Sequence, residues 1–434
     1  MKRKIIKDLI NWKNSLSDMP YMLVGTRQVG KTYILDEFCK ENYSNYLYIN
    51  LEKEESIKEI FESTLDPKEI ITSISIIKDI KIVLEDTVIF FDEIQVSERA
   101  ITSLKYFNEA KEKYNIVCAG SLLGVALNRF KNSYPVGKVR KVMLCPMDFE
   151  EFLWAVDQDA LTEKIKECFI NNTQMMESIH KKALSLYRDY LYVGGMPACV
   201  LEYIKKDCNL SNYDNIIKQN IIDAYMYDMS KHTTSAENIK INKLYKSVPK
   251  QLNRGNTKFT YKIVEEKANK RNYETSIDWL VNSNIVNKCA LVETPKIPIS
   301  VYEKENTFKI YLNDVGLLCE LSSIKLKDLY ANDFNLYKGM LCENYVAQSF
   351  VANCLKLNYW KSKKDAEIDF LLNIDGNVIP IEVKSATNAK AKSLKIYIEK
   401  YNPKYSIKIS SRNFGFVNNI KSIPLYSVYL LSDE

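Results

Sequence analysis

Two glycines separated by four residues and followed by lysine and threonine form the most specific chemical pattern in this sequence of 434 residues. In such a loop, successive backbone N–H groups make a concave anion site, the lysine reaches the outer phosphates and the threonine hydroxyl ligates Mg²⁺. The pattern predicts a site for ATP and Mg²⁺, and the alternative is a chance match. Its residues are Gly25, Thr26, Arg27, Gln28, Val29, Gly30, Lys31 and Thr32.

Two adjacent carboxylates follow an apolar run about sixty residues later. The run Val88–Phe91 ends in Asp92 and Glu93. A buried parallel strand is apolar on both faces, and its carboxyl end opens at the same sheet edge as a phosphate loop. We therefore expect Asp92 to lie beside Mg²⁺ and Glu93 to polarise the attacking water as the catalytic base. The alternative is a core strand capped by surface acids.

Two further residues could act on the phosphates. The apolar run Asn115–Gly120 ends at Ser121, which is predicted to reach the same edge and sense the γ-phosphate; a turn serine is the alternative. After the turn at Gly137, Lys138 or Arg140 could contact phosphates of its own or a neighbour's nucleotide. Either of these two could equally be surface charge.

These residues need a parallel sheet to bring them together. The short apolar run Tyr21–Val24 precedes the glycine loop, a helical pattern follows it, and Tyr46–Leu51 is a further apolar run. Strands that alternate with helical segments indicate an α/β fold with a parallel sheet. The carboxyl ends of parallel strands meet at one edge, where the predicted site residues would converge.

Several motifs resemble those of prokaryotic AAA-type ATP-binding proteins that carry a C-terminal domain of long-unassigned function. The resemblance covers essentially the whole chain and implies an AAA-type P-loop NTPase core, ATP hydrolysis, and a homo-oligomer between a dimer and a hexameric ring. Many relatives have Gly-Arg where this chain has Gly137-Lys138, which leaves any arginine finger open. The matching segments are 25–32, Phe-Phe-Asp-Glu-Ile-Gln at 90–95, Ala-Gly-Ser-Leu-Leu-Gly at 119–124, 146–153, 192–197, 247–252, 313–318 and the tail.

A second constellation of charged residues lies in the last hundred residues. Glu343 is on a predicted helix, Asp369 interrupts the alternating run 366–372, and Glu382 and Lys384 lie two residues apart on the next strand. This pattern resembles the restriction-endonuclease-like fold, in which carboxylates hold Mg²⁺ beside the scissile phosphate and a lysine orients water. It predicts metal ligation by Glu343, Asp369 and Glu382, and catalysis by Asp369, Glu382 and Lys384. The alternatives are ordinary charge alternation on strands and a fold retained only for binding.

Positive charge is concentrated in the C-terminal half. Residues 240–271 contain ten basic and two acidic side chains, within a segment that reads as helices followed by a β-ribbon. This order suggests a winged helix that contacts DNA, while a connector with a solvated lysine face is the alternative. The predicted contacts are Lys243, Lys246, Lys250, Arg254 and Lys258.

Composition limits the class of protein. Hydrophobic residues at 46% and charged residues at 27% are typical of a globular protein, and no run approaches a membrane span or a signal peptide. Ten cysteines without a Cys-X-X-Cys pair and only two histidines argue against zinc and for reduced thiols, so we expect a cytoplasmic protein without a membrane partner.

The sequence predicts four domains and a DNA-directed machine. They are an AAA-type ATPase core (1–155), a helical lid (156–238), a winged-helix-like connector (239–330) and an α/β nuclease-like domain (331–434). The predicted function is ATP hydrolysis coupled to action on DNA, with a Mg²⁺-dependent nuclease-like tail. The alternative is a nucleotide-gated switch whose tail only binds DNA or a protein partner.

Overall fold

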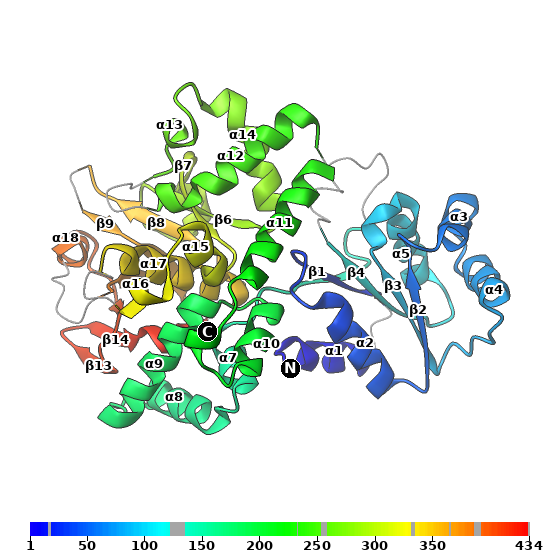
Figure 1. The fold of residues 1–434 in the computed structure, drawn as a ribbon, viewed down its shortest axis with the longest axis horizontal. Helices are drawn as coiled ribbons and strands as arrows, with labels where there is room; N and C mark the ends of the chain where they lie inside the picture. Colours follow the sequence, from blue (N-terminus) through cyan, green and yellow to red (C-terminus); the bar gives the residue numbers. More distant parts are fainter. Residues whose placement is uncertain are drawn as a thin grey trace. The chain divides into compact units, whose positions relative to one another are not determined.

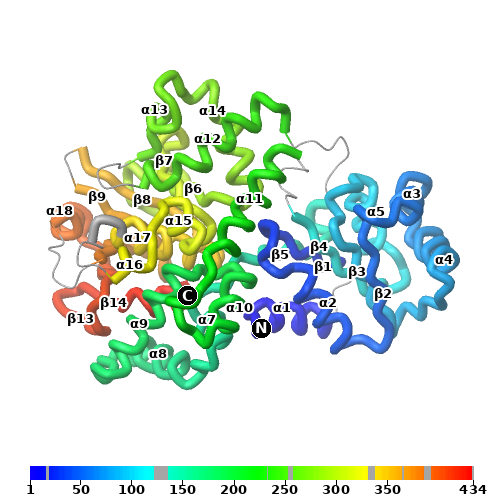
Figure 2. The backbone as a smooth tube through the Cα atoms, viewed as in Figure 1, coloured from blue at the N-terminus to red at the C-terminus, as the bar shows by residue number. Residues whose placement is uncertain are grey.

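The computed structural model of the chain separates into two compact units (Figures 1 and 2). The first contains residues 2–145 with 282–284, and the second contains Met1, residues 146–281 and residues 285–434. The structure describes residues 1–15, 19–121, 135–231, 233–252, 258–330, 335–363, 366–385 and 392–432. No helix among these residues is both long and apolar enough to cross a membrane.

The first unit is built on a parallel sheet with strand order β2-β3-β4-β1-β5. Every pair of neighbouring strands in it runs parallel, so all carboxyl ends lie along one edge. This confirms the predicted α/β P-loop core. The strands are β1 (Tyr21–Val24), β2 (Asn45–Asn50), β3 (Thr87–Asp92), β4 (Asn115–Gly120) and β5 (Arg140–Met143), and the helices are α1 (Ile5–Lys13), α2 (Lys31–Asn42), α3 (Glu55–Ser63), α4 (Pro67–Lys78) and α5 (Glu98–Glu109).

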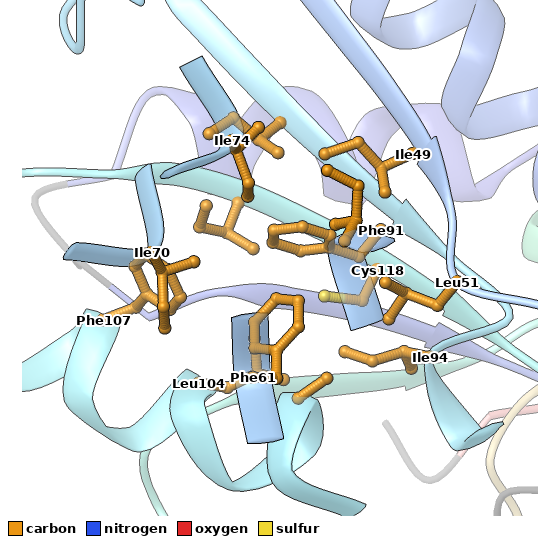
Figure 3. Packing of buried hydrophobic residues seen from close by; sticks show 14 of the residues in the cluster. Ile49, Leu51, Phe61, Ile70, Ile74, Phe91, Ile94, Leu104, Phe107 and Cys118 are labelled. Atoms are coloured by element: carbon orange, nitrogen blue, oxygen red, sulfur yellow. The ribbon is translucent and has the colours of Figure 1, made fainter. Parts of the chain in front are cut away.

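Helices cover the central strands on both faces, which explains why those strands are apolar throughout. Every residue of β3 is buried. On one face, Phe91 packs edge-to-face on Phe61 of α3, with ring centroids 5.5 Å apart. Figure 3 shows this pair among Ile70 and Ile74 of α4. This packing fixes the strand that carries the two predicted carboxylates at its end.

The second unit begins with a long helical region, as the spacing of its apolar residues predicted. The break expected at the two glycines is present, since α9 ends at Val193 and α10 begins at Pro197. The helices are α7 (Phe149–Ala155), α8 (Asp159–Asn171), α9 (Glu177–Val193), α10 (Pro197–Lys205), α11 (Ile216–Lys231), α12 (Ser235–Gln251), α13 (Tyr261–Val264) and α14 (Lys270–Asn282).

The glycine motif at this break packs against the later Asn-Asp-Val-Gly motif. The Asp314 carboxylate accepts hydrogen bonds from the backbone N–H groups of Gly195, at 2.6 Å, and Leu317, at 2.9 Å. A Cβ on Gly195 would lie 2.0 Å from the Met147 carbonyl oxygen, and one on Gly316 would lie 2.4 Å from the Val193 carbonyl oxygen. Both motifs therefore serve close backbone packing within this unit.

The β-ribbon that follows these helices belongs to a larger sheet. β6 (Val286–Val292) and β7 (Glu303–Leu312) pair antiparallel, β8 (Asn358–Lys361) pairs parallel with β6, and β9 (Glu367–Ile368) pairs with β8. The sheet order is β7-β6-β8-β9. Strands from before and after residue 331 thus share one sheet. The helices between them are α15 (Val315–Leu321), α16 (Leu326–Tyr330) and α17 (Asn335–Ala352).

A second, mixed sheet completes this unit, with order β10-β11-β12-β14-β13. Its inner pairs are parallel and its outer pairs antiparallel. Its elements are β10 (Phe370–Ile374), β11 (Asn377–Val383), α18 (Lys392–Tyr401), β12 (Ser406–Ser410), β13 (Gly415–Val417), β14 (Ile420–Pro424) and the short 3₁₀ segment η5 (Leu425–Leu430).

The single strand predicted at 366–372 is wrong in one respect. The chain forms β9 in one sheet and β10 in the other, and Asp369 lies between them. The Asp369 carboxylate accepts the backbone N–H of Val383 at 2.7 Å. Asp369 therefore marks the point where the chain changes sheets, because one alternating run supplies a strand to each.

Candidate functional site

The glycine loop joins β1 to α2 by a tight backbone turn. Gly30 precedes α2 with φ 93°, and Gln28 has φ 64°. Gly25 has φ 153°, and a Cβ at this position would lie 2.3 Å from the carbonyl oxygen of Leu144. Both the turn and the close approach need glycine. The loop therefore ends at the N-terminus of α2, where backbone N–H groups favour an anion.

The lysine of this loop is almost buried. Lys31 is 8% exposed, and its Nζ donates to the carbonyl oxygens of Gly25, at 3.0 Å, and Thr26, at 2.8 Å. These two acceptors are neutral groups of the loop itself. Phosphate oxygens bind an ammonium more strongly than carbonyls do, because a hydrogen bond between charged groups is the stronger one. Lys31 is therefore positioned for an anionic ligand of the loop.

The structure brings Thr32 and Asp92 together, as predicted. Thr32 Oγ1 lies 3.1 Å from the nearer Asp92 carboxylate oxygen, and the Tyr48 hydroxyl donates to the same carboxylate at 2.8 Å. Burial raises the pKa of Asp92, while the hydrogen bonds from Tyr48 and Thr32 act in the opposite direction. A hydroxyl and a carboxylate side by side are oxygen ligands that suit Mg²⁺, so these two residues fit the predicted metal.

Tyr48 was not predicted. It lies on β2 opposite Phe90 of β3, and the side-chain periods of these strands bring its hydroxyl to the end of β3. The alternating run that predicted β2 contained Tyr48, but only the pairing of β2 with β3 could have shown its role.

The second carboxylate is held by polar side chains. Glu93 has φ 53°, the left-handed conformation that a residue with a side chain rarely adopts. Its Oε2 accepts hydrogen bonds from Gln95 Nε2 at 2.5 Å and from Ser121 Oγ at 3.2 Å. Glu93 and Ser121 thus meet at one sheet edge, as predicted. Gln95, which is the last residue of the Phe-Phe-Asp-Glu-Ile-Gln motif, was missed as a site residue.

The two candidate cations after Gly137 contact carboxylates of the same unit. Lys138 Nζ lies 3.0 Å from Glu109 Oε1, and the Arg140 guanidinium pairs with Asp8. A contact of either residue with a nucleotide stays a prediction.

In the second unit, the predicted carboxylates surround a lysine that the sequence did not single out. Lys309 on β7 is 7% exposed, and its Nζ lies 2.9 Å from Glu343 Oε1 and 2.5 Å from Glu367 Oε1. The Tyr311 hydroxyl also donates to Glu343, at 2.5 Å. Burial opposes ionisation of Glu343, but the charge of Lys309 and the hydrogen bond from Tyr311 hold its pKa below the ordinary value.

The other predicted residues of this group are close to the same charges. Lys384 Nζ lies 2.7 Å from Glu382 Oε1. Burial and the charge of Glu343 raise the pKa of Asp369 to about 7, although Lys309 and Lys384 favour its ionised form. We call Glu343, Glu367, Asp369, Glu382, Lys309 and Lys384 the carboxylate cluster. The structure therefore brings the four predicted residues together and adds two.

The carboxylate cluster, as arranged, does not fit the predicted metal. Among the residues that the structure describes, no group of three or more His, Cys, Asp or Glu side chains could hold a metal ion. Glu343 and Glu367 are instead paired with Lys309, and Glu382 with Lys384. Ligation of Mg²⁺ by Glu343, Asp369 and Glu382 thus stays a prediction without support from this geometry.

Three of the predicted DNA contacts form a stripe on α12. Lys243, Lys246 and Lys250 are exposed and spaced three and four residues apart, which places them on one helical face. Lys243 Nζ lies 2.6 Å from Glu265 Oε2. Lys258 is exposed too, whereas Arg254 lies outside the described residues.

Comparison with protein families divides the chain into three parts. Residues 17–153 match the family described as "AAA domain". Residues 184–328 and 338–428 match two domains of unknown function, DUF8612 and DUF4143. The first unit is accordingly an AAA-domain P-loop ATPase fold. No curated protein matches the chain.

Solved structures with similar folds include three DNA-related or nucleotide-bound proteins by title. The Aeropyrum pernix ORC2 protein in ADPNP-ADP complexes is 11% identical with a TM-score of 0.39, and the match covers 74% of this chain and 91% of that one. Cdc6p from Pyrobaculum aerophilum is 13% identical over 74% and 91%, with a TM-score of 0.27. The Thermotoga maritima RuvB Holliday junction branch migration motor is 11% identical over 68% and 90%, with a TM-score of 0.31.

Proposed function

We propose that the first unit hydrolyses ATP with Mg²⁺. The observation that carries this proposal is the convergence of four side chains from the glycine loop, β3 and β4. Thr32 contacts Asp92, and Ser121 contacts Glu93, at the carboxyl edge of one parallel sheet. This is the edge at which α/β sheets bind nucleotides.

Each residue has a separate part in the reaction. The loop N–H groups and Lys31 bind the phosphates, with Lys31 exchanging its carbonyl contacts for phosphate oxygens. Thr32 and Asp92 would hold Mg²⁺, which neutralises charge on the phosphates when it is bound. Glu93 orients and polarises the attacking water, and Ser121 contacts both Glu93 and the γ-phosphate. Gln95 positions the Glu93 carboxylate until water or nucleotide replaces that contact.

Two substitutions test this assignment. Lys31→Ala should weaken ATP binding, measured with a fluorescent ATP analogue. Glu93→Gln should keep ATP bound and stop phosphate release, because only the group that polarises water is lost. Wild-type turnover in Glu93→Gln would remove Glu93 from this role.

We further propose that ATP strengthens self-association of the chain into dimers or rings. AAA-type sites commonly take a positive group from a neighbouring subunit, and Lys138 stands where many relatives have arginine. Sedimentation at micromolar protein with ATP and Mg²⁺ should show a species larger than the monomer. A strict monomer under these conditions would contradict the proposal.

For the second unit we propose DNA binding without cleavage. The lysine stripe on α12 supports contacts to phosphates, and the pairing of the carboxylate cluster with its own lysines argues against a metal-dependent reaction. The order of α12, α13 and α14 followed by the β6–β7 hairpin is also that of a winged helix.

Metal-dependent cleavage by Asp369, Glu382 and Lys384 is the competing prediction for this unit. Plasmid and single-stranded DNA incubated with Mg²⁺ or Mn²⁺, with and without ATP, separates the two. Cutting that disappears in Asp369→Ala would favour the nuclease, while binding without any cutting would favour our proposal.

A further inference from the structure

Lys309 is held by carboxylates from two different elements. Glu343 comes from α17 and Glu367 from β9, and the Lys309 ammonium lies within 2.9 Å of an oxygen of each. Its Nζ also lies 5.2 Å from the centre of the Tyr359 ring. A buried ammonium is costly unless it is paired and hydrogen-bonded. These contacts therefore stabilise both the lysine and the two acids.

The cluster keeps acceptor atoms that its lysines do not use. In the part of the chain that the structure describes, Glu367 Oε2 and Glu382 Oε2 are buried and accept no hydrogen bond. Glu382 is 2% exposed. A buried carboxylate oxygen without a donor is unfavourable, so the cluster has room for more positive charge than two ammonium groups supply.

The place of Lys309 is the one that a bridging cation would take. Its Nζ joins single oxygens of two acids from separate elements, at distances slightly longer than those of Ca²⁺ to oxygen. We propose that the Lys309 ammonium stands in for a divalent cation between Glu343 and Glu367, and that removing its charge turns the cluster into a divalent-cation site. This deepens the proposal that the second unit works without a metal.

The origin of Lys309 explains why the tail alone does not show this. Lys309 lies in the segment that matches DUF8612, whereas Glu343 and Glu367 lie in the segment that matches DUF4143. β7 and β9 are the two outer strands of one sheet, and this sheet carries the lysine to the acids. The internal cation is thus supplied by the preceding segment of the chain.

Counting bound Mn²⁺ tests the proposal directly. The full chain is used without nucleotide and with Asp92→Asn, so that the ATP site does not contribute, and free Mn²⁺ is measured by electron paramagnetic resonance. Lys309→Met should bind Mn²⁺ at least about tenfold tighter than the parent, because two freed carboxylates become ligands. Lys288→Met is the matched control, since Lys288 is half-buried on the neighbouring strand and lies 4.6 Å from the Phe308 ring. Equal Mn²⁺ affinity in Lys309→Met and the control would overturn the proposal.

A second measurement does not depend on whether Lys309→Met folds. The thermal unfolding midpoint of the Asp92→Asn protein should be the same in EDTA and in millimolar Mn²⁺. A Mn²⁺-induced rise that disappears in Glu367→Gln would show that the unsubstituted cluster already takes a metal, and would overturn the inference. Loss of DNA binding alone would count against the DNA proposal and leave this one standing.

Discussion

Lys31 and Lys309 are buried to almost the same degree, with 8% and 7% of their surface exposed, but their partners differ in charge. Lys31 donates to two carbonyl oxygens of its own loop, whereas Lys309 is paired with two carboxylates. Neutral acceptors can be exchanged for the phosphates of a ligand. Carboxylates satisfy the ammonium within the chain, so the first site is open to ligand and the second is closed on itself.

The largest effect that we predict is on catalysis at the first site. Glu93→Gln should lower kcat for ATP hydrolysis about 10²–10⁴-fold, because a general base is lost while the phosphate contacts remain. Phosphate release under saturating ATP measures it, and the exposed Glu112→Gln is the control. A loss of less than tenfold would mean that another group polarises the water.

Replacing each lysine by methionine should have opposite consequences. Lys309→Met leaves buried carboxylates unpaired and should cost about 3–5 kcal/mol of unfolding free energy, with ATP affinity unchanged. Lys31→Met should abolish ATP binding at a smaller cost in stability. Urea unfolding and ATP titration of both proteins measure this. The comparison fails if the two variants lose stability equally.

How far the sequence could predict these two sites differs for a physical reason. The residues of the ATP site occupy contiguous motifs at strand ends, so a parallel sheet was enough to place Lys31, Asp92 and Glu93. Tyr48 and Lys309 reach their sites only through strand pairing, β2 with β3 and β7 within the four-stranded sheet. Such partners are not encoded in local spacing.

The break at Asp369 illustrates the same limit. An alternating run fits one strand as well as two short ones, and only the packing of two sheets decides between them. The sequence thus predicted which acids would gather, but it could not show that Lys309 would already occupy their centre.

Charge reversal on α12 should weaken DNA binding by the second unit. Changing Lys243, Lys246 and Lys250 to Glu removes up to three phosphate contacts, so the slope of log affinity against log salt should become shallower by about 2–3. Fluorescence anisotropy at several salt concentrations measures the slope. Reversal of Lys105, Lys111 and Lys113 in the first unit is the control. An unchanged slope in the α12 variant would place the DNA surface elsewhere, for example near Lys361 and Lys363, since Lys364 lies outside the described residues.

The smallest effect concerns the hydroxyl that orients Asp92. Tyr48→Phe removes the 2.8 Å hydrogen bond and should weaken Mg²⁺-dependent ATP hydrolysis roughly tenfold. Mg²⁺ titration of turnover should show the change in the metal concentration needed for half activity. A variant with the wild-type Mg²⁺ dependence would make Tyr48 a packing residue only.

The most direct test of the whole account is the number of metal ions that a chain holds when ATP is bound. Glu93→Gln protein saturated with ATP and Mn²⁺, separated from free metal and analysed for manganese, should contain a single Mn²⁺ per chain, lost on further substitution of Lys31 by Ala. A second Mn²⁺ that disappears in Glu367→Gln would contradict an internal cation at the carboxylate cluster. Absence of any bound Mn²⁺ would contradict the ATP site.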